Sequence, residues 1–199
     1  IFSAWLLPWM WYYIPMLNKK TLINNTNKKE NTMNKNQLVL SKHIISMVKI
    51  SKDVDSVGSE PELTNYLLRN AIAKYSLAND NYSTTQFTLN QMKEKGLDIT
   101  KRGQKSRKNE YTFEHPIPAK VLFDLILKAK NDEEITSILK YSDQVVILSH
   151  SEDKKLNEAG FKSTMPKDWK YGDDVFARYK KVNISILTEK VKMTGGIKR

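Results

Sequence analysis

The feature that most constrains the fold is the recurrence of apolar residues at helical spacing in the first half of residues 33–199. Within residues 38–50, Leu40, Ile44, Met47 and Val48 can share one face of a helix. The run Ser59-Glu60-Pro61-Glu62 has the spacing of a capping box, with proline near the helix start, and predicts a second amphipathic helix. This half of the chain is therefore predicted to be helical.

Four more helices are predicted further along the chain. One covers residues 83–95 and ends at Gly96, where a left-handed cap is natural. Two others cover residues 119–130 and a segment that starts at Asp132. The last covers residues 149–158, because Ser149 and Glu152 repeat the capping-box spacing and a glycine follows.

Three segments are predicted to be strands. Residues 111–113 alternate between apolar and polar, residues 145–148 form a β-branched run typical of a buried strand, and residues 182–187 resemble a last strand. The predicted fold class is therefore α+β, with a helical N-terminal half and a small sheet in the C-terminal half.

Residues 1–32 differ from the rest of the chain. Residues 1–17 are nearly all apolar, but Pro8 and Pro15 interrupt them, and residues 18–32 are polar with no core-forming pattern. Because globular patterning begins at Met33, we interpret residues 1–32 as non-native upstream translation or a membrane-like leader. Residues 33–199 are interpreted as a single basic domain.

The composition limits the partners and cofactors. A formal charge of +11 favours a polyanionic partner, and nucleic acid and an anionic membrane both qualify. The partner that we expect is nucleic acid, DNA more than RNA. The chain has no cysteine, so thiolate chemistry is excluded and a cytoplasmic location is expected. With only 7 glycines and no Gly-rich phosphate loop, no nucleotide cofactor is expected. A homodimer is compatible with the sequence.

One short segment concentrates positive charge. Residues 101–108 include five basic residues and no acidic one. These residues are predicted to contact nucleic-acid phosphates, although a solvated loop explains the same composition. The five are Lys101, Arg102, Lys105, Arg107 and Lys108.

The sequence Glu114-His115-Pro116-Ile117-Pro118 follows that segment closely. The two prolines stiffen the backbone around an adjacent carboxylate and imidazole. Histidine exchanges a proton near neutral pH, so His115 is a candidate general base or metal ligand, and Glu114 would orient it or hold a cation. The alternative is a strand-end pair that makes a local hydrogen bond.

Two further residues are candidates for a supporting catalytic role. His150 is predicted to lie in the first turn of a helix, directly after a strand, and could face the same pocket as His115 if the two strands are neighbours. Arg178 follows Asp173 and Asp174 and is a candidate to grip a phosphate, or alternatively to form a salt bridge at the edge of the core.

The five residues from Glu114 to Pro118 resemble the first half of the HNH, or ββα-metal, nuclease signature. In that family an acidic residue binds a divalent metal and the histidine activates the attacking water. The resemblance implies that Glu114 holds a metal ion such as Mg²⁺ and that His115 acts as the base.

The sequence thus predicts a metal-dependent endonuclease, of a restriction or mobile-element type. Two alternatives remain open. One is a nucleic-acid-binding regulator without catalysis, and the other is a metal-independent ribonuclease that uses His115 and His150 as base and acid.

Overall fold

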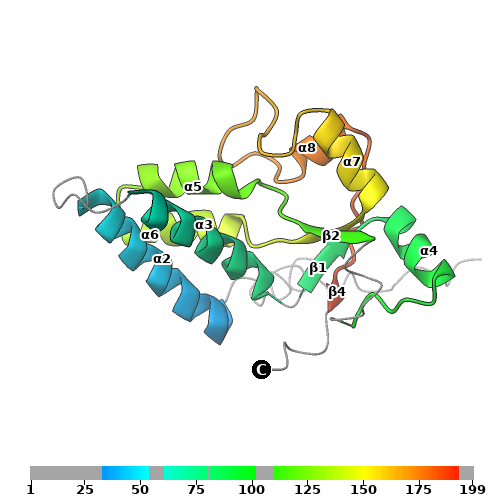
Figure 1. Ribbon diagram of the computed structural model, residues 1–199, viewed down its shortest axis with the longest axis horizontal. Helices are drawn as coiled ribbons and strands as arrows, with labels where there is room; N and C mark the ends of the chain where they lie inside the picture. The colour runs from blue at the N-terminus through cyan, green and yellow to red at the C-terminus, as the bar shows by residue number, and fades with distance from the viewer. Residues whose placement is uncertain (1–32, 54–60, 80, 102–109, 193–199) are drawn as a thin grey trace, which may run out of the picture. The chain divides into compact units, whose positions relative to one another are not determined.

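The computed structural model describes residues 33–53, 61–79, 81–101 and 110–192, all of which belong to one compact unit, Met33–Arg199. These residues form helices and a four-stranded mixed sheet, so the predicted α+β fold class is confirmed (Figure 1). Within these ranges, no helix combines the length and apolar character needed to cross a membrane. The expectations for residues 1–32 lie outside the described residues.

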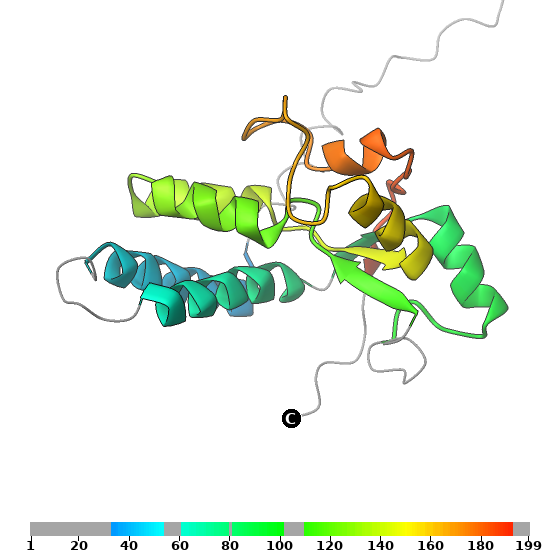
Figure 2. The same ribbon diagram turned by 45° about the horizontal axis from the view of Figure 1, so that its top comes forward.

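Four helices form one part of the unit. Helices α2 (Lys35–Asp53) and α3 (Pro61–Leu77) lie side by side, and α5 (Ala119–Lys128) and α6 (Asp132–Tyr141) pack against them (Figure 2). Their apolar faces share one core, as the helical spacing predicted. The fully buried side chains of that core include Ile44, Leu68, Ile72, Tyr75, Leu122, Ile126 and Leu139.

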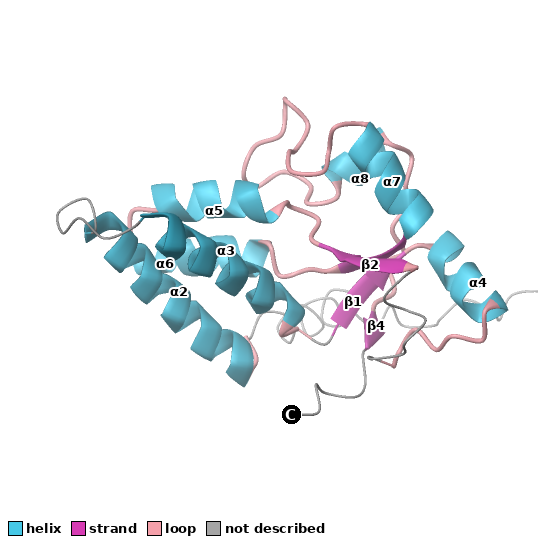
Figure 3. Cartoon of the chain, in the orientation of Figure 1, coloured by secondary structure: helices cyan, strands magenta, loops and turns pink. Residues whose placement is uncertain are grey.

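The sheet is small and mixed. It consists of β1 (Asn81–Thr84), β2 (Tyr111–Glu114), β3 (Val146–Ser149) and β4 (Val191–Lys192), in the order β2-β3-β1-β4. Figure 3 shows the strands in magenta among the helices. β3 pairs antiparallel with β2 and parallel with β1, and β1 pairs antiparallel with β4. The sheet therefore joins a strand from the first half of the chain to three from the second.

Helices cover both faces of the sheet. The side chains of β3 alternate between the faces: Ile147 packs in a cluster with Met92 of α4 (Gln86–Glu94), and Leu148 packs in a cluster with Leu156 of α7 (His150–Glu158). Helix α8 (Ala177–Lys181) contributes Tyr179 to the second cluster. A strand buried on both faces has a continuous run of apolar residues, and this run made β3 predictable.

Two parts of the secondary-structure prediction are wrong. Residues 81–84 form β1, although residues 83 and 84 were predicted to open the next helix, which starts at Gln86. These mostly polar residues carry no clear apolar alternation, and the pairing of Ser83 with Val146 defines the strand. Residues 182–187 are not a strand. Ile184 N donates to Tyr179 O at 2.9 Å and Asn183 has a φ of 55°, so the chain turns directly after α8.

The cap predictions for α4 and α7 are confirmed, whereas Ser59 and Glu60 of the other predicted capping box lie outside the described residues. Ser149 and Glu152 form a complete capping box at the start of α7. Gly96 and Gly160, which follow α4 and α7, have φ values of 64° and 80°, in the left-handed region that favours glycine. These caps fix where α4 and α7 stop.

Candidate functional site

The structure brings Glu114 and Arg178 together. Glu114 is the last residue of β2, and its carboxylate accepts a hydrogen bond from Nη2 of Arg178 on α8. The Arg178 side chain is 1% exposed and that of Glu114 is 24% exposed. The sequence suggested both residues as site residues but gave no reason to expect them in contact.

Arg178 is held from several directions. Its Nε donates to Pro116 O at 2.8 Å, its Nη1 donates to Phe161 O at 2.6 Å, and its Nη2 also donates to His115 O. Because a guanidinium has five N–H donors, these bonds and the ion pair use most of its capacity. Arg178 therefore ties α8 to the junction after β2 and to the segment after α7, and little of it remains to grip a phosphate.

Glu114 does not fit the metal-ligand role that its sequence context predicted. Its carboxylate is occupied by a cation that is always charged, and a divalent ion beside that guanidinium would be repelled. Burial raises the pKa of Glu114, and the Arg178 guanidinium opposes that rise. In the part of the chain that the structure describes, no three histidine, aspartate or glutamate side chains converge as metal ligands.

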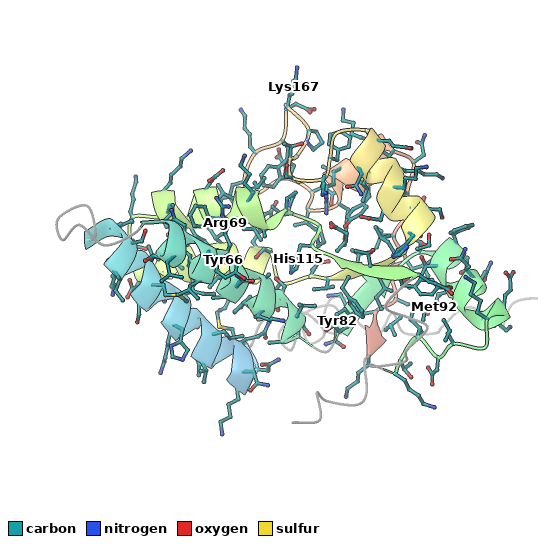
Figure 4. The ribbon with its side chains drawn as sticks, in the orientation of Figure 1. Tyr66, Arg69, Tyr82, Met92, His115 and Lys167 are labelled. Atoms are coloured by element: carbon teal, nitrogen blue, oxygen red, sulfur yellow. The ribbon has the colours of Figure 1, made fainter. Side chains whose placement is uncertain are left out.

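His115 faces the helices and not Arg178. Its Nε2 lies 3.1 Å from Ala73 O on α3 (Figure 4). A carbonyl oxygen only accepts, so Nε2 carries the proton and Nδ1 is the acceptor of the neutral ring. Burial lowers the pKa of His115, which favours this neutral form. The hydrogen bond to α3 accounts for His115 as a packed strand-end residue. It joins residues 42 apart in the sequence, so it is not the local hydrogen bond of the alternative interpretation.

His150 lies far from His115. It is exposed, and its backbone N donates to Glu110 O at 3.0 Å. The antiparallel register pairs Glu114 with Val146 and Tyr111 with Ser149, so the two histidines stand at opposite ends of β2, five residues apart along it. At the rise of a strand this is roughly 17 Å. The two strands are neighbours, but they run antiparallel, so the two histidines do not face one pocket.

Only the first residue of the basic segment is described. Lys101 is exposed, and its Nζ lies 3.5 Å from Oδ2 of Asp98. The other four basic residues, Arg102, Lys105, Arg107 and Lys108, lie outside the described residues.

Two described residues that flank that segment in the sequence are joined. Lys95 and Glu110 form an ion pair, and Glu110 O accepts the hydrogen bond from His150 N. Lys95, just after α4, is therefore held close to the start of α7.

A buried polar network that the sequence analysis did not assign holds α4 against the sheet. Oε2 of Glu152 accepts hydrogen bonds from Thr88 Oγ1 at 2.6 Å and from Ser149 Oγ at 2.8 Å, and Ser149 N donates to Thr88 Oγ1 at 2.8 Å. The capping-box spacing revealed the Ser149 and Glu152 half of the network. Thr88 comes from another part of the chain, and only the tertiary structure adds it.

Comparison with known proteins gives no relative: no family model, no curated protein and no solved structure matches this chain.

Proposed function

We propose that this protein binds nucleic acid and that its basic surface makes the contact. The observation that carries the proposal is the different placement of cations and carboxylates. Every described lysine and Arg69 is exposed, whereas only half of the carboxylates with a described side chain are. The surface is therefore more basic than the composition alone implies, and a basic surface attracts the phosphate backbone and releases its counterions.

Three of the carboxylates that are not exposed have internal roles, whereas others, such as Asp98 and Asp132, pair with lysines at the surface. Glu114 pairs with the buried Arg178, and Glu152 serves the network that holds α4. Asp143 accepts hydrogen bonds from Gln37 at 2.7 Å and Asn79 at 3.0 Å. These negative charges are used to build the fold, so they screen little of the positive charge that faces a partner.

The region around the basic segment is the part of this surface that we assign to phosphate contact. Lys95 and Glu110 flank this segment in the sequence and are held together by their ion pair, and Glu110 O accepts the bond from His150 N. Because these flanking residues are held close together, binding loses less conformational entropy than it would for an open chain. The five basic residues named above lie between Lys95 and Glu110 in the sequence.

Titration of fluorescent duplex DNA, single-stranded DNA and RNA with the full-length protein at several salt concentrations tests the proposal. Replacing Arg102, Lys105, Arg107 and Lys108 with glutamine should weaken binding and reduce the slope of log K against log salt. The matched control replaces the same number of exposed lysines on the helical part. These are Lys35, Lys42, Lys74 and Lys128. Equal losses in both variants would refute the assignment of the contact, and no binding at any salt would refute the function.

A metal-dependent endonuclease, of a restriction or mobile-element type, is the second candidate. Strands β2 and β3 are antiparallel, and α7 follows β3. This is the order of elements that the ββα name describes, except that α5 and α6 are inserted between the two strands. The Asp153 carboxylate of α7 also contributes to the raised pKa of Glu114. For Glu114 to hold a divalent metal such as Mg²⁺, Arg178 would have to release it.

Incubating the protein with duplex DNA and with RNA, with Mg²⁺, Mn²⁺ or a chelator, separates the two functions. Cleavage that needs the metal and is lost in His115→Ala would establish the endonuclease. Cleavage in chelator that needs both His115 and His150 would establish the ribonuclease, despite their separation. Retained binding without cleavage is the result we expect.

A further inference from the structure

We propose that α4 reads base pairs in the major groove of duplex DNA, an inference that rests on the proposed nucleic-acid binding. The helix has two distinct faces. Thr88 is 0% exposed and Met92 is 1% exposed, and Met92 points toward the sheet (Figure 4). The opposite face carries Gln86, Asn90, Lys93 and Glu94, all exposed, which a turn of 3.6 residues places in one row.

The outward face of α4 has a fixed orientation. Thr85 caps the helix through the bond from Thr88 N at 3.0 Å, and Thr88 is bound in turn by Glu152 and Ser149. Gly96 ends the helix in the left-handed conformation. A helix that is anchored at its start and along its buried side cannot rotate freely, so the same side chains always face outward. Recognition of a base edge needs this kind of preorganisation.

The outward row contains an amide pair. Nε2 of Gln86 donates to Oδ1 of Asn90 at 2.8 Å. The structure shows no partner among its described residues for Oε1 of Gln86 or for Nδ2 of Asn90. One acceptor and one donor are thus presented side by side. The major-groove edge of adenine offers the N7 acceptor and the N6 donor, which is the complementary set.

The neighbours of the amide pair fit the same groove. Phe87 is 53% exposed, and an exposed aromatic ring beside an adenine-reading amide fits the methyl group of thymine. Lys93 is exposed one turn further on and can reach a phosphate. We therefore expect A·T pairs in the recognised sequence.

The position of α4 allows the approach of a duplex. Figures 1 and 2 both show α4 at one end of the sheet, on the side away from α2, α3, α5 and α6. Lys95 follows the helix directly, Lys101 lies further along the chain, and both are exposed. A B-DNA major groove admits a helix, whereas the deep and narrow major groove of A-form RNA does not. Double-stranded RNA should therefore bind more weakly than duplex DNA.

The test begins with selection of bound sequences from a pool of random duplex DNA by the full-length protein. The selected duplex, a scrambled duplex of the same composition and double-stranded RNA of the same sequence are then titrated at several salt concentrations. Asn90→Ala and Phe87→Ala should each reduce the preference for the selected over the scrambled duplex, on the order of 5-fold to 150-fold. Affinity for the scrambled duplex and its salt dependence should stay within about twofold of wild type.

The matched control is Asn70→Ala. Asn70 is an exposed asparagine on α3, bonded to its own helix at Tyr66 O, and lies outside α4. The preference of the Asn70→Ala variant for the selected over the scrambled duplex should equal that of the wild type. The melting temperatures of all variants should agree because the altered side chains are exposed. If no sequence is enriched, if Asn90→Ala and Phe87→Ala keep the preference, or if RNA binds as tightly as DNA, the reading role of α4 is wrong while nucleic-acid binding stands. If no nucleic acid binds, the proposed function itself fails.

Discussion

Arg178 and Glu114 are 64 residues apart in the sequence and form an ion pair in which the guanidinium is almost completely shielded from solvent. The same guanidinium donates to the carbonyl groups of His115, Pro116 and Phe161. Three segments of the chain therefore meet at one side chain. A buried pair of this kind is costly to break from one side, because the remaining charge and carbonyls lose their partner.

Arg178→Met should destabilise the protein by about 3–5 kcal/mol, because it leaves the Glu114 carboxylate and three carbonyls without a donor. Arg178→Lys should restore only part of this stability, since an ammonium lacks the planar fork. Urea denaturation followed by circular dichroism gives the free energy of unfolding. In the double variant Arg178→Met with Glu114→Gln, the loss should be smaller than the sum of the two single losses. Strict additivity would contradict the coupling.

The stability of the protein should fall as the pH drops below about 6.5, because burial lowers the pKa of His115 in the folded state. The sign follows from proton uptake: below the unfolded pKa the unfolded chain binds a proton that the folded protein does not. Denaturation in urea between pH 7.5 and pH 5 measures the effect. His115→Gln should flatten the dependence, since glutamine donates to Ala73 O without titrating. His150→Gln, at an exposed position, is the control.

Glu152→Ala should loosen α4. The change removes the acceptor for Thr88 Oγ1 and Ser149 Oγ and half of the capping box, so we expect a loss of about 2–4 kcal/mol. Hydrogen exchange should rise in α4 and in the first turn of α7 more than in α2 or α3. Glu158→Ala, in the last turn of the same helix and exposed, should leave α4 protected. If hydrogen exchange in the Glu152→Ala variant rose equally in α4, α7, α2 and α3, the network would not anchor α4.

Two neighbouring leucines on α3 should respond differently to truncation. Leu68 is 0% exposed and packs in the helical core, so Leu68→Ala should lose about 2–5 kcal/mol through the lost burial and the cavity left behind. Leu67 is 49% exposed, and Leu67→Ala should change stability by about 0.5 kcal/mol. The unfolding midpoints in urea give both values. Equal losses would show that α3 is rotated from the orientation described.

Local signals were sufficient for the helices. Apolar spacing predicted α2, α3, α5 and α6, and short-range caps predicted the limits of α7, because these features depend on residues within one or two turns. The buried strand β3 was predictable from its β-branched run. The strand β1 was not, since its polar side chains acquire meaning only from pairing with β3.

In the candidate site, too, some features depend on neighbouring residues and others on long-range contacts. The sequence by itself determined that this is a basic α+β protein, and it singled out Glu114, His115 and Arg178, because composition and periodicity are local properties. The tertiary structure decided what those residues do: it joined Glu114 to Arg178, turned His115 toward Ala73 and placed His150 at the other end of β2. Strand direction and long-range pairing have no signature within a short window of sequence, so only the folded chain reveals them.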